Sequence, residues 1–177
     1  QSDEYRNAYN ETSSPSDYIE MHDNEQPSRL DRIGATFFRD KIVLDFGCGG
    51  GAFLDLVSGL SRETLGIEPF SGYHESLIDR GHEMFSNMET AQSKYKDKVD
   101  SIVSFCVLEH VQNPQQYLKD ACSLLKKSGK MYLETDNIHN ILMKFNINSF
   151  DEFFYRTAHL YYFEDKTLRK MAEQAGF

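Results

Sequence analysis

From Lys41 onward, short apolar runs alternate with longer amphipathic segments along the chain. Runs rich in β-branched residues and bounded by Gly, Asp, Asn or Ser are typical of buried strands, and apolar positions at helical spacing are typical of helices. Because such alternation forms parallel βα units, the pattern predicts an α/β fold with a doubly wound, mostly parallel sheet and helices on both faces. The expected strands are Lys41–Phe46, Thr64–Glu68, Glu83–Ser86, Ser101–Phe105 and Lys130–Thr135, and the expected helices are Gln26–Phe38, Gly51–Leu60, Ser71–Arg80, Ala91–Tyr95, Pro114–Lys127 and Asp165–Ala175.

Two segments fall outside this alternation. Residues 1–24 carry tyrosines among Asp, Asn and Ser, so we expect either a lid that packs aromatic rings over a ligand or a loosely held arm. Residues 25–177 then form one domain, which is a usual domain size. Between Asp136 and His159 lies an irregular stretch rich in Phe, Asn and Ile. Loops of this length inside a compact domain are usually functional, so we expect substrate contacts there.

Charge and hydropathy exclude several partners. The net charge is −9, and Lys and Arg cluster only in the short segment Lys119–Lys130, so a nucleic-acid substrate is disfavoured. No apolar run approaches the roughly 18 residues of a membrane-spanning helix, so we expect no membrane partner. The first residues do not read as a secretory signal, and a cytoplasmic location is the expectation.

The cysteines and several histidines suggest no metal site. Cys48, Cys106 and Cys122 form no CxxC pair and have no His at zinc-ligand spacing. Cys106 and Cys122 lie in apolar runs and are expected to be reduced thiols of the core. Three further histidines show no partner in the sequence and are expected to be exposed, namely His22, His74 and His82.

The segment Ile42–Ala52 leads from a buried strand through a glycine turn into a helix. Glycines permit positive φ and close approach of a ligand, and a helix N-terminus offers unpaired N–H groups, so a nucleotide-like ligand fits this turn. Gly47, Gly49 and Ala52 satisfy the dinucleotide pattern GxGxxG/A as well. Glu68 follows Gly47 by 21 residues and can accept hydrogen bonds from two ribose hydroxyls. Because both nicotinamide and S-adenosyl cofactors carry that ribose, these residues leave the ligand open.

Asp45, two residues before Gly47, distinguishes between a nicotinamide and an S-adenosyl cofactor. Its carboxylate would face the pyrophosphate of NAD, and like charges about 4 Å apart repel by about 1 kcal/mol in water and by more near a protein surface. S-adenosylmethionine instead carries an ammonium and a sulfonium, which an acid attracts. The charge pattern therefore favours the methyl donor.

Several motifs together resemble a known family. Leu44–Gly51 resembles the first motif of class I S-adenosylmethionine-dependent methyltransferases, and Gly66–Pro69 resembles their second-strand acid. Asp100–Val111 is similar to their fourth-strand segment with Leu-Glu-His, and His159–Phe163 with the final Ala-Gly-Phe resembles the small-molecule branch near ubiquinone-biosynthesis-type O-methyltransferases. The resemblance covers about Lys41–Phe177 and implies the sheet order 3-2-1-4-5.

The resemblance implies S-adenosylmethionine as the donor and S-adenosylhomocysteine as the product. It implies that Asp45, Gly47 and Gly49 cradle the methionine part and that Glu68 holds the ribose. The other implied donor contacts are Phe46 and Cys48 in the loop, Pro69 and Phe70 beside the adenine, Asn87, Met88 and Glu89 after the third strand, and Phe105 and Cys106 through backbone atoms.

Methyl transfer is an in-line displacement, so alignment of donor and acceptor in a dry pocket is the main requirement. A general base assists when the acceptor is a hydroxyl. Because the acceptor enters above the strand ends, the candidate bases are Asp136, His139 and His159. Glu109 and His110 are interpreted as a capping and packing pair beneath the site.

The favoured hypothesis is methyl transfer to O or N of a small-molecule acceptor. The alternatives are a nicotinamide-dependent oxidoreductase and a non-catalytic module that binds the donor. Family members normally add an antiparallel hairpin after the Ala-Gly-Phe turn, whereas this sequence stops at Phe177. We therefore expect the C-terminal hairpin to be missing and the exposed edge to be covered by a further tail or a partner, such as the second copy in a homodimer.

Overall fold

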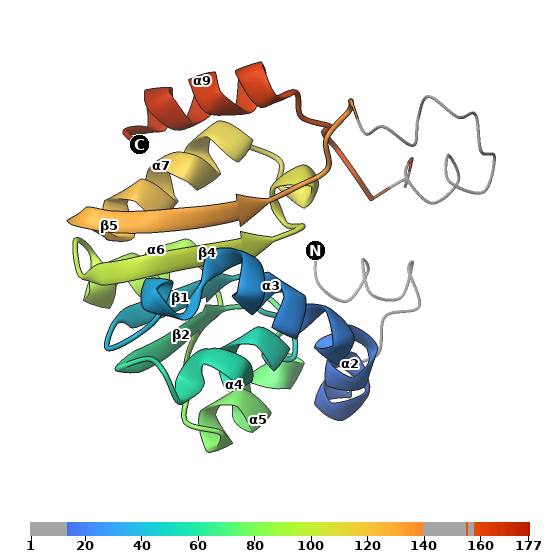
Figure 1. Ribbon diagram of the computed structural model, residues 1–177, viewed down its shortest axis with the longest axis vertical. Helices are drawn as coiled ribbons and strands as arrows, with labels where there is room; N and C mark the ends of the chain where they lie inside the picture. Colours follow the sequence, from blue (N-terminus) through green and yellow to red (C-terminus); the bar gives the residue numbers. More distant parts are fainter. Residues whose placement is uncertain (1–13, 140–154, 156–157) are drawn as a thin grey trace. The chain divides into compact units, whose positions relative to one another are not determined.

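The computed structural model describes residues 14–139, 155 and 158–177 (Figure 1). Its sheet has five parallel strands in the order β3-β2-β1-β4-β5. The predicted doubly wound α/β fold and its strand order are therefore confirmed. The strands are β1 Ile42–Phe46, β2 Glu63–Ile67, β3 Glu83–Phe85, β4 Val99–Phe105 and β5 Leu125–Glu134.

Helices connect these strands, and α3 and α4 lie in front of the strands in Figure 1 while α6 lies behind them. No helix among the described residues has both the length and the apolar character needed to cross a membrane. The α-helices are α2 Pro15–His22, α3 Gln26–Ile33, α4 Ala52–Ser58, α5 His74–Asp79, α6 Met88–Tyr95, α7 Pro114–Leu124 and α9 Asp165–Ala175, and the 3-10 turns are Asp23–Glu25, Ala35–Phe37, Ser71–Tyr73 and Leu108–His110.

The described residues form two compact units. The first unit comprises residues 14–104 and 123–132, and the second comprises residues 105–122, 133–139, 155 and 158–177. Apolar side chains of the strands form the core of the first unit, and these side chains are fully buried. Helices between the strands cover the faces of the sheet. These core residues include Val43, Leu44, Leu65, Val99, Ile102 and Val103.

The strand order reverses next to β1, and this reversal sets the place of a ligand site. β1 pairs on one side with β2, where Asp45 lies opposite Gly66, and on the other side with β4, where Val43 lies opposite Ser101. In open parallel sheets, ligands bind beyond the carboxyl ends of the strands at such a reversal. The residues that follow Phe46 therefore occupy the expected position for a binding loop.

Several helix predictions required correction of their bounds, and two of them show the physical reason. The expected helix Gln26–Phe38 ends at Ile33, because Gly34 adopts φ 85° and donates its N–H to the Leu30 carbonyl at 2.8 Å. The expected helix Ala91–Tyr95 begins already at Met88. Its first turn is capped by Asn87, whose Oδ1 accepts the Thr90 N–H at 2.9 Å.

The junction between α7 and β5 also differs from the expectation. The helix predicted to reach Lys127 ends at Leu124, and the strand predicted to begin at Lys130 begins at Leu125. The last carbonyls of α7 are taken by a neighbouring loop, since the N–H of Lys98 donates to the Leu124 carbonyl at 3.0 Å. Lys126 Nζ then pairs with Asp100 at 2.7 Å, which keeps this residue in the strand.

We expect the stability of the first unit to depend on its strand core. Replacing Leu44, which is fully buried in β1, by Ala should lower the free energy of unfolding by about 2–5 kcal/mol. Leu56→Ala on the exposed side of α4 is the matched control and should change it by less than about 1 kcal/mol. Urea denaturation followed by circular dichroism measures both, and equal losses in the two variants would contradict this prediction.

Candidate functional site

The loop between β1 and α4, residues 47–51, is called the glycine loop below. Gly47, Gly49 and Gly51 have φ values of 81°, 52° and 87°, a region that side chains other than glycine rarely occupy. The Gly47 N–H donates to the Ile67 carbonyl of β2 at 2.8 Å, and the Gly51 N–H donates to the Cys48 carbonyl at 2.9 Å. The loop is thus a tight turn that is tied to the neighbouring strand.

Glu68 follows the end of β2 and contacts the glycine loop directly. Its Oε2 accepts the N–H of Gly49 at 3.1 Å, and its Oε1 accepts the N–H of Phe70 at 2.8 Å. The backbone carbonyl of Glu68 also lies 2.7 Å from Nε2 of His74. The structure therefore fixes this buried carboxylate beside the loop, where the sequence predicted an acid for a ribose.

Asp45, in β1, is a buried acid at the start of the same region. Only 3% of its surface is exposed, and burial raises the pKa of its carboxyl from 3.8 to about 7. The Arg29 guanidinium opposes this shift, whereas the nearby Glu68 carboxylate adds to it. Among the described residues, the cationic charge of Arg29 therefore compensates Asp45 only in part.

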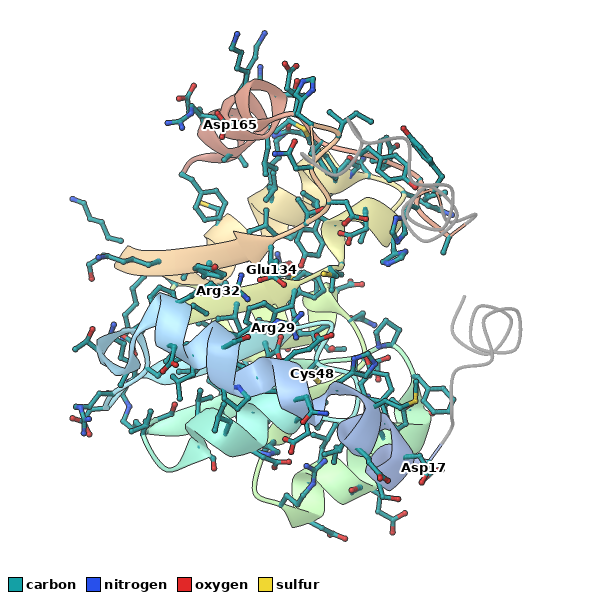
Figure 2. All side chains as sticks on the ribbon, turned by 45° about the vertical axis from the view of Figure 1, so that its right-hand side comes forward. Asp17, Arg29, Arg32, Cys48, Glu134 and Asp165 are labelled. Atoms are coloured by element: carbon teal, nitrogen blue, oxygen red, sulfur yellow. The ribbon has the colours of Figure 1, made fainter. Side chains whose placement is uncertain are left out.

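Arg29 is a residue of this region that the sequence analysis did not single out. It lies on α3, its side chain is 11% exposed, and its guanidinium pairs with Glu25 at 3.2 Å and with Gln26 Oε1 at 3.3 Å. Figure 2 labels it on the helix and labels Cys48 in the glycine loop. The sequence around Arg29 does not indicate a functional role, because only the packing of α3 brings this arginine near Asp45.

The helix α2 covers part of the glycine loop. A Cβ placed on Gly49 would collide with the ring of Tyr18, so the absent side chain is what admits this ring. The Tyr18 ring also lies 4.5 Å from the ring of His22 and 5.3 Å from that of Tyr73. These contacts place α2 against the glycine loop, and residues 1–13 of the N-terminal segment lie outside the described part of the chain.

The other predicted donor residues of the first unit differ in how far they are buried. The Cys48 thiol is buried, and its burial together with Asp45 and Glu68 raises its pKa well above 9.0, so it remains protonated. Phe70 is partly buried and packs edge-on against Tyr73 at 5.0 Å. Among the other predicted donor residues, Phe46 and Gly47 are half-buried and Pro69 is exposed. In the first turn of α6, Met88 is half-buried and Glu89 is exposed.

In the second unit, the residue after β4 has an unusual backbone. Cys106 adopts φ 54°, and its N–H donates to the Glu134 carbonyl at 2.8 Å. A left-handed conformation at a residue other than glycine costs of order 1–3 kcal/mol and is concentrated at functional sites. The prediction that Cys106 is a core thiol is wrong, because this turn leaves its side chain exposed, while Phe105 is half-buried.

Two of the predicted catalytic residues lie together in the second unit. Asp136 Oδ2 is 2.9 Å from Nδ1 of His159, whose side chain is 9% exposed. The pairing of two backbone segments brings them together, since the Phe163 N–H donates to the Asp136 carbonyl at 3.1 Å and the Ile138 N–H donates to the Phe163 carbonyl at 3.0 Å. His139 lies apart from this pair, is 68% exposed, and has its Nε2 3.3 Å from Glu164.

Glu109 and His110 lie beside His159 in the same unit. One possible ligand atom of each of the three lies within 4.8 Å of the others, and the two histidine rings pack edge-on at 4.8 Å. Burial raises the pKa of the Glu109 carboxyl, although Thr135 Oγ1 donates a hydrogen bond to it at 2.8 Å. Two imidazoles and a carboxylate can move a proton or hold a divalent cation. The described residues thus include a set of possible metal ligands that the sequence analysis did not expect.

The predictions for the remaining histidines and for the long loop have different outcomes. His82 was expected to be exposed, and this is wrong because its side chain is 1% exposed and has polar partners on both ring nitrogens. His22 and His74 are half-buried rather than exposed. Most of the stretch expected to contact the substrate, residues 140–154 and 156–157, lies outside the described residues.

Comparison with known sequences gives one family. A family model described as a methyltransferase domain matches residues 19–177. The chain is 31% identical to the ubiquinone biosynthesis O-methyltransferase of Yersinia enterocolitica over 125 residues, which cover 63% of this chain and 50% of that protein. It is 30% identical to the Escherichia coli protein of the same description over 117 residues, which cover 60% and 47%. The chain thus spans about half the length of these curated relatives.

Comparison with solved structures gives the same fold. A SAM-dependent methyltransferase from Archaeoglobus fulgidus matches with a TM-score of 0.69 and 22% identity, over 90% of this chain and 69% of that one. A SAM-dependent methyltransferase from Aquifex aeolicus matches with a TM-score of 0.64 and 17% identity, over 92% and 88%. The family resemblance stated from the motifs is confirmed by the family match, and none of these findings supports the oxidoreductase alternative.

The raised pKa of Asp45 predicts a pH-dependent stability. A carboxyl whose folded pKa is about 7 and whose ordinary value is 3.8 stabilises the fold at low pH and loses that contribution as the pH rises through 7. We expect the unfolding free energy of the wild type, relative to Asp45→Asn, to fall between about pH 4 and pH 7 by up to about 1.4 kcal/mol per pH unit. Urea titrations at a series of pH values measure it, and a difference that is independent of pH would refute it.

Proposed function

The chain belongs to the family of methyltransferase domains, and on this premise we propose that it binds S-adenosylmethionine and transfers the methyl group to an oxygen or nitrogen of a small-molecule acceptor. The observation that carries the proposal is the buried acid Asp45 at the carboxyl end of β1, next to a glycine loop that Glu68 also contacts. These are the features that a cationic, ribose-bearing ligand requires.

Asp45 and Arg29 suit the two charges of an amino acid. A buried carboxyl whose pKa is raised to about 7 gains a partner when an ammonium group approaches, so binding of the donor favours its ionised form. The guanidinium of Arg29, which lies near enough to lower that pKa, is suited to a carboxylate. We therefore assign the ammonium of the methionine part to Asp45 and its carboxylate to Arg29.

Glu68 is assigned to the ribose. Its carboxylate is already oriented by the N–H groups of Gly49 and Phe70, and each oxygen can accept a further hydrogen bond. The ring of Phe70 is suited to stack beside the adenine, as are residues of the first turn of α6 such as Met88. Tyr18 on α2 packs on the glycine loop and is suited to cover the bound donor.

The Asp136–His159 pair is proposed to accept the proton of a hydroxyl acceptor. A carboxylate at Nδ1 favours the imidazole tautomer whose Nε2 carries the lone pair, which is the form that a base needs. When bound, S-adenosylmethionine would supply an electrophilic methyl group, with S-adenosylhomocysteine as the product. For a hydroxyl acceptor, Nε2 of His159 would take the proton, and the neighbouring carboxylate of Asp136 would stabilise the imidazolium.

An oxygen acceptor is favoured over nitrogen. The curated relatives are described as O-methyltransferases, and a paired, largely buried histidine is of most use for an acceptor that must lose a proton. A non-catalytic module that only binds the donor differs from this proposal by the absence of turnover.

Donor binding gives the first test. We expect Glu68→Gln to weaken the affinity for S-adenosylmethionine by about tenfold or more, because hydrogen bonds to a charged group contribute about 1.5–3 kcal/mol. Glu75→Gln on the exposed side of α5 is the matched control and should leave the affinity unchanged. Isothermal titration calorimetry measures all three proteins, and no heat from the wild type would overturn the proposed function.

The role of His159 gives the second test. We expect His159→Gln to lower kcat by about 10²- to 10⁴-fold with little change in donor affinity, because the substitution removes the proton acceptor. His139→Gln, which alters the exposed histidine, is the control and should retain turnover. Release of S-adenosylhomocysteine with a panel of phenols and alcohols measures the rate. Full turnover by His159→Gln would exclude it as the base.

A further inference from the structure

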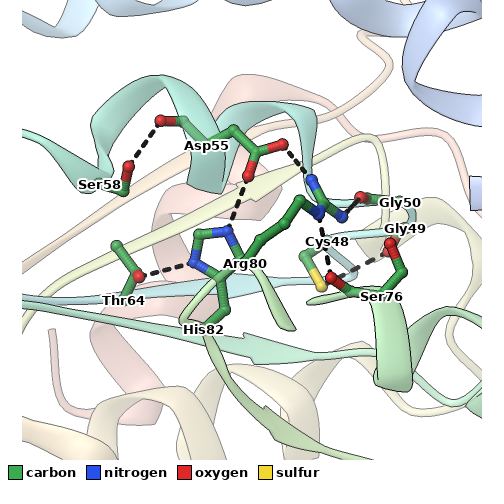
Figure 3. Close-up of polar contacts among 9 residues, drawn as sticks. All are labelled: Cys48, Gly49, Gly50, Asp55, Ser58, Thr64, Ser76, Arg80 and His82. Carbon is green, nitrogen blue, oxygen red and sulfur yellow. Dashed lines mark hydrogen bonds and ion pairs between the residues drawn. The ribbon is translucent and has the colours of Figure 1, made fainter. Parts of the chain in front are cut away.

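The glycine loop is anchored on the side of its Gly50 carbonyl by an arginine from another element. Arg80 directly follows α5, and its Nη2 donates to the Gly50 carbonyl at 2.6 Å (Figure 3). Gly50 itself is buried, so its carbonyl depends on a partner within the protein. The loop is thus held by Ile67 at the N–H of Gly47, by Glu68 at the N–H of Gly49 and by Arg80 at the carbonyl of Gly50.

The orientation of the Arg80 guanidinium is fixed by two further contacts. Its Nη1 forms an ion pair with Oδ2 of Asp55 in the first turn of α4, and its Nε donates to the Ser76 carbonyl at 3.1 Å. A planar guanidinium can serve these acceptors at once because its donors have a fixed geometry, whereas an ammonium acts as a single point charge. The three contacts therefore aim Nη2 at the glycine loop.

Asp55 is in turn held by a buried histidine. Its Oδ1 lies 2.9 Å from Nε2 of His82, and Nδ1 of His82 lies 2.7 Å from Oγ1 of Thr64 in β2. When Nε2 donates to the carboxylate, Nδ1 accepts the hydroxyl proton of Thr64, so both ring nitrogens are satisfied. Arg80, Asp55, His82 and Thr64, called the support network below, connect β2 to the glycine loop through α4 (Figure 3).

None of the four residues of the support network is among the predicted donor-binding residues. Its members were not predicted from the sequence, and His82 was expected to be exposed. A loop with several glycines in the left-handed region has many alternative conformations, and ordering it on binding costs affinity. Contacts that fix the loop before binding reduce that cost.

We propose that Arg80 is a positioning residue of the donor site, which acts through the Gly50 carbonyl to hold the glycine loop in the conformation that binds S-adenosylmethionine. Asp55 and His82 act through Arg80 by keeping its guanidinium aimed at the loop. This inference rests on the proposed function, because it concerns the affinity for the same donor.

Donor affinity and loop exchange test the inference together. We expect Arg80→Ala to weaken the binding of S-adenosylhomocysteine, measured by calorimetry, by about tenfold, because a charge-assisted hydrogen bond to the loop is lost. Arg80→Lys should recover only part of this affinity. In hydrogen exchange without any ligand, peptides covering residues 47–51 should exchange faster in Arg80→Ala than in the wild type.

The matched control is Arg62→Ala. Arg62 also pairs with an aspartate, Asp100 at 3.1 Å, but this pair involves β4 and not the glycine loop. Arg62→Ala should therefore leave both the donor affinity and the hydrogen exchange of the glycine loop unchanged. The melting temperatures of Arg80→Ala and Arg62→Ala show how much of any effect comes from a general loss of stability. Addition of guanidinium ion at millimolar concentration should restore part of the affinity of Arg80→Ala and should not affect the control.

The outcomes separate the two claims. A wild type that binds the ligand, with equal affinity and equal loop exchange in Arg80→Ala and Arg62→Ala, would overturn the positioning role and leave the proposed function intact. A wild type that binds neither S-adenosylmethionine nor S-adenosylhomocysteine would overturn both. Weaker binding and faster loop exchange confined to the Arg80 variants would support the inference.

Discussion

The arrangement of the first unit depends on the burial of carboxylates at the carboxyl ends of β1 and β2. An ionised carboxyl away from water is costly unless a cation or several N–H groups compensate it. Glu68 is compensated by backbone N–H groups of the glycine loop and of Phe70. Asp45 is compensated only in part by Arg29, and the pKa of its carboxyl is raised to about 7 as a result. A cationic ligand would complete this compensation, which is why the unit is suited to a methyl donor.

The conformation of the glycine loop depends on contacts with residues outside it. Glycines let the chain turn tightly after β1, but the same freedom leaves the loop poorly defined by its own sequence. Residues outside the loop fix its conformation, namely Ile67 and Glu68 at its N–H groups and Arg80, held by Asp55, at the Gly50 carbonyl. Affinity for a ligand at this loop then depends on residues that need not contact the ligand.

The second unit gathers a different kind of chemistry. Asp136 and His159 are brought together by short backbone pairings around Phe163, and Glu109 and His110 lie beside them. The strained backbone of Cys106 follows β4 in the same unit. A carboxylate-paired histidine suits proton transfer, which is the chemistry proposed for this unit.

The sequence by itself determined that five strands exist, their order through the family resemblance, and the places of Asp45 and Glu68 at the ends of the first two strands, because local periodicity and short motifs specify them. It did not determine the start of β5. Only the tertiary structure decided the contacts of Arg80 and His82 and the proximity of Arg29 to Asp45, since these groups come together from different elements. It also decided that Asp136 pairs with His159 while His139 lies apart. The physical reason is that hydrophobic periodicity specifies which face of an element is buried, whereas a polar pair between distant residues forms only where packing brings both side chains within hydrogen-bond distance.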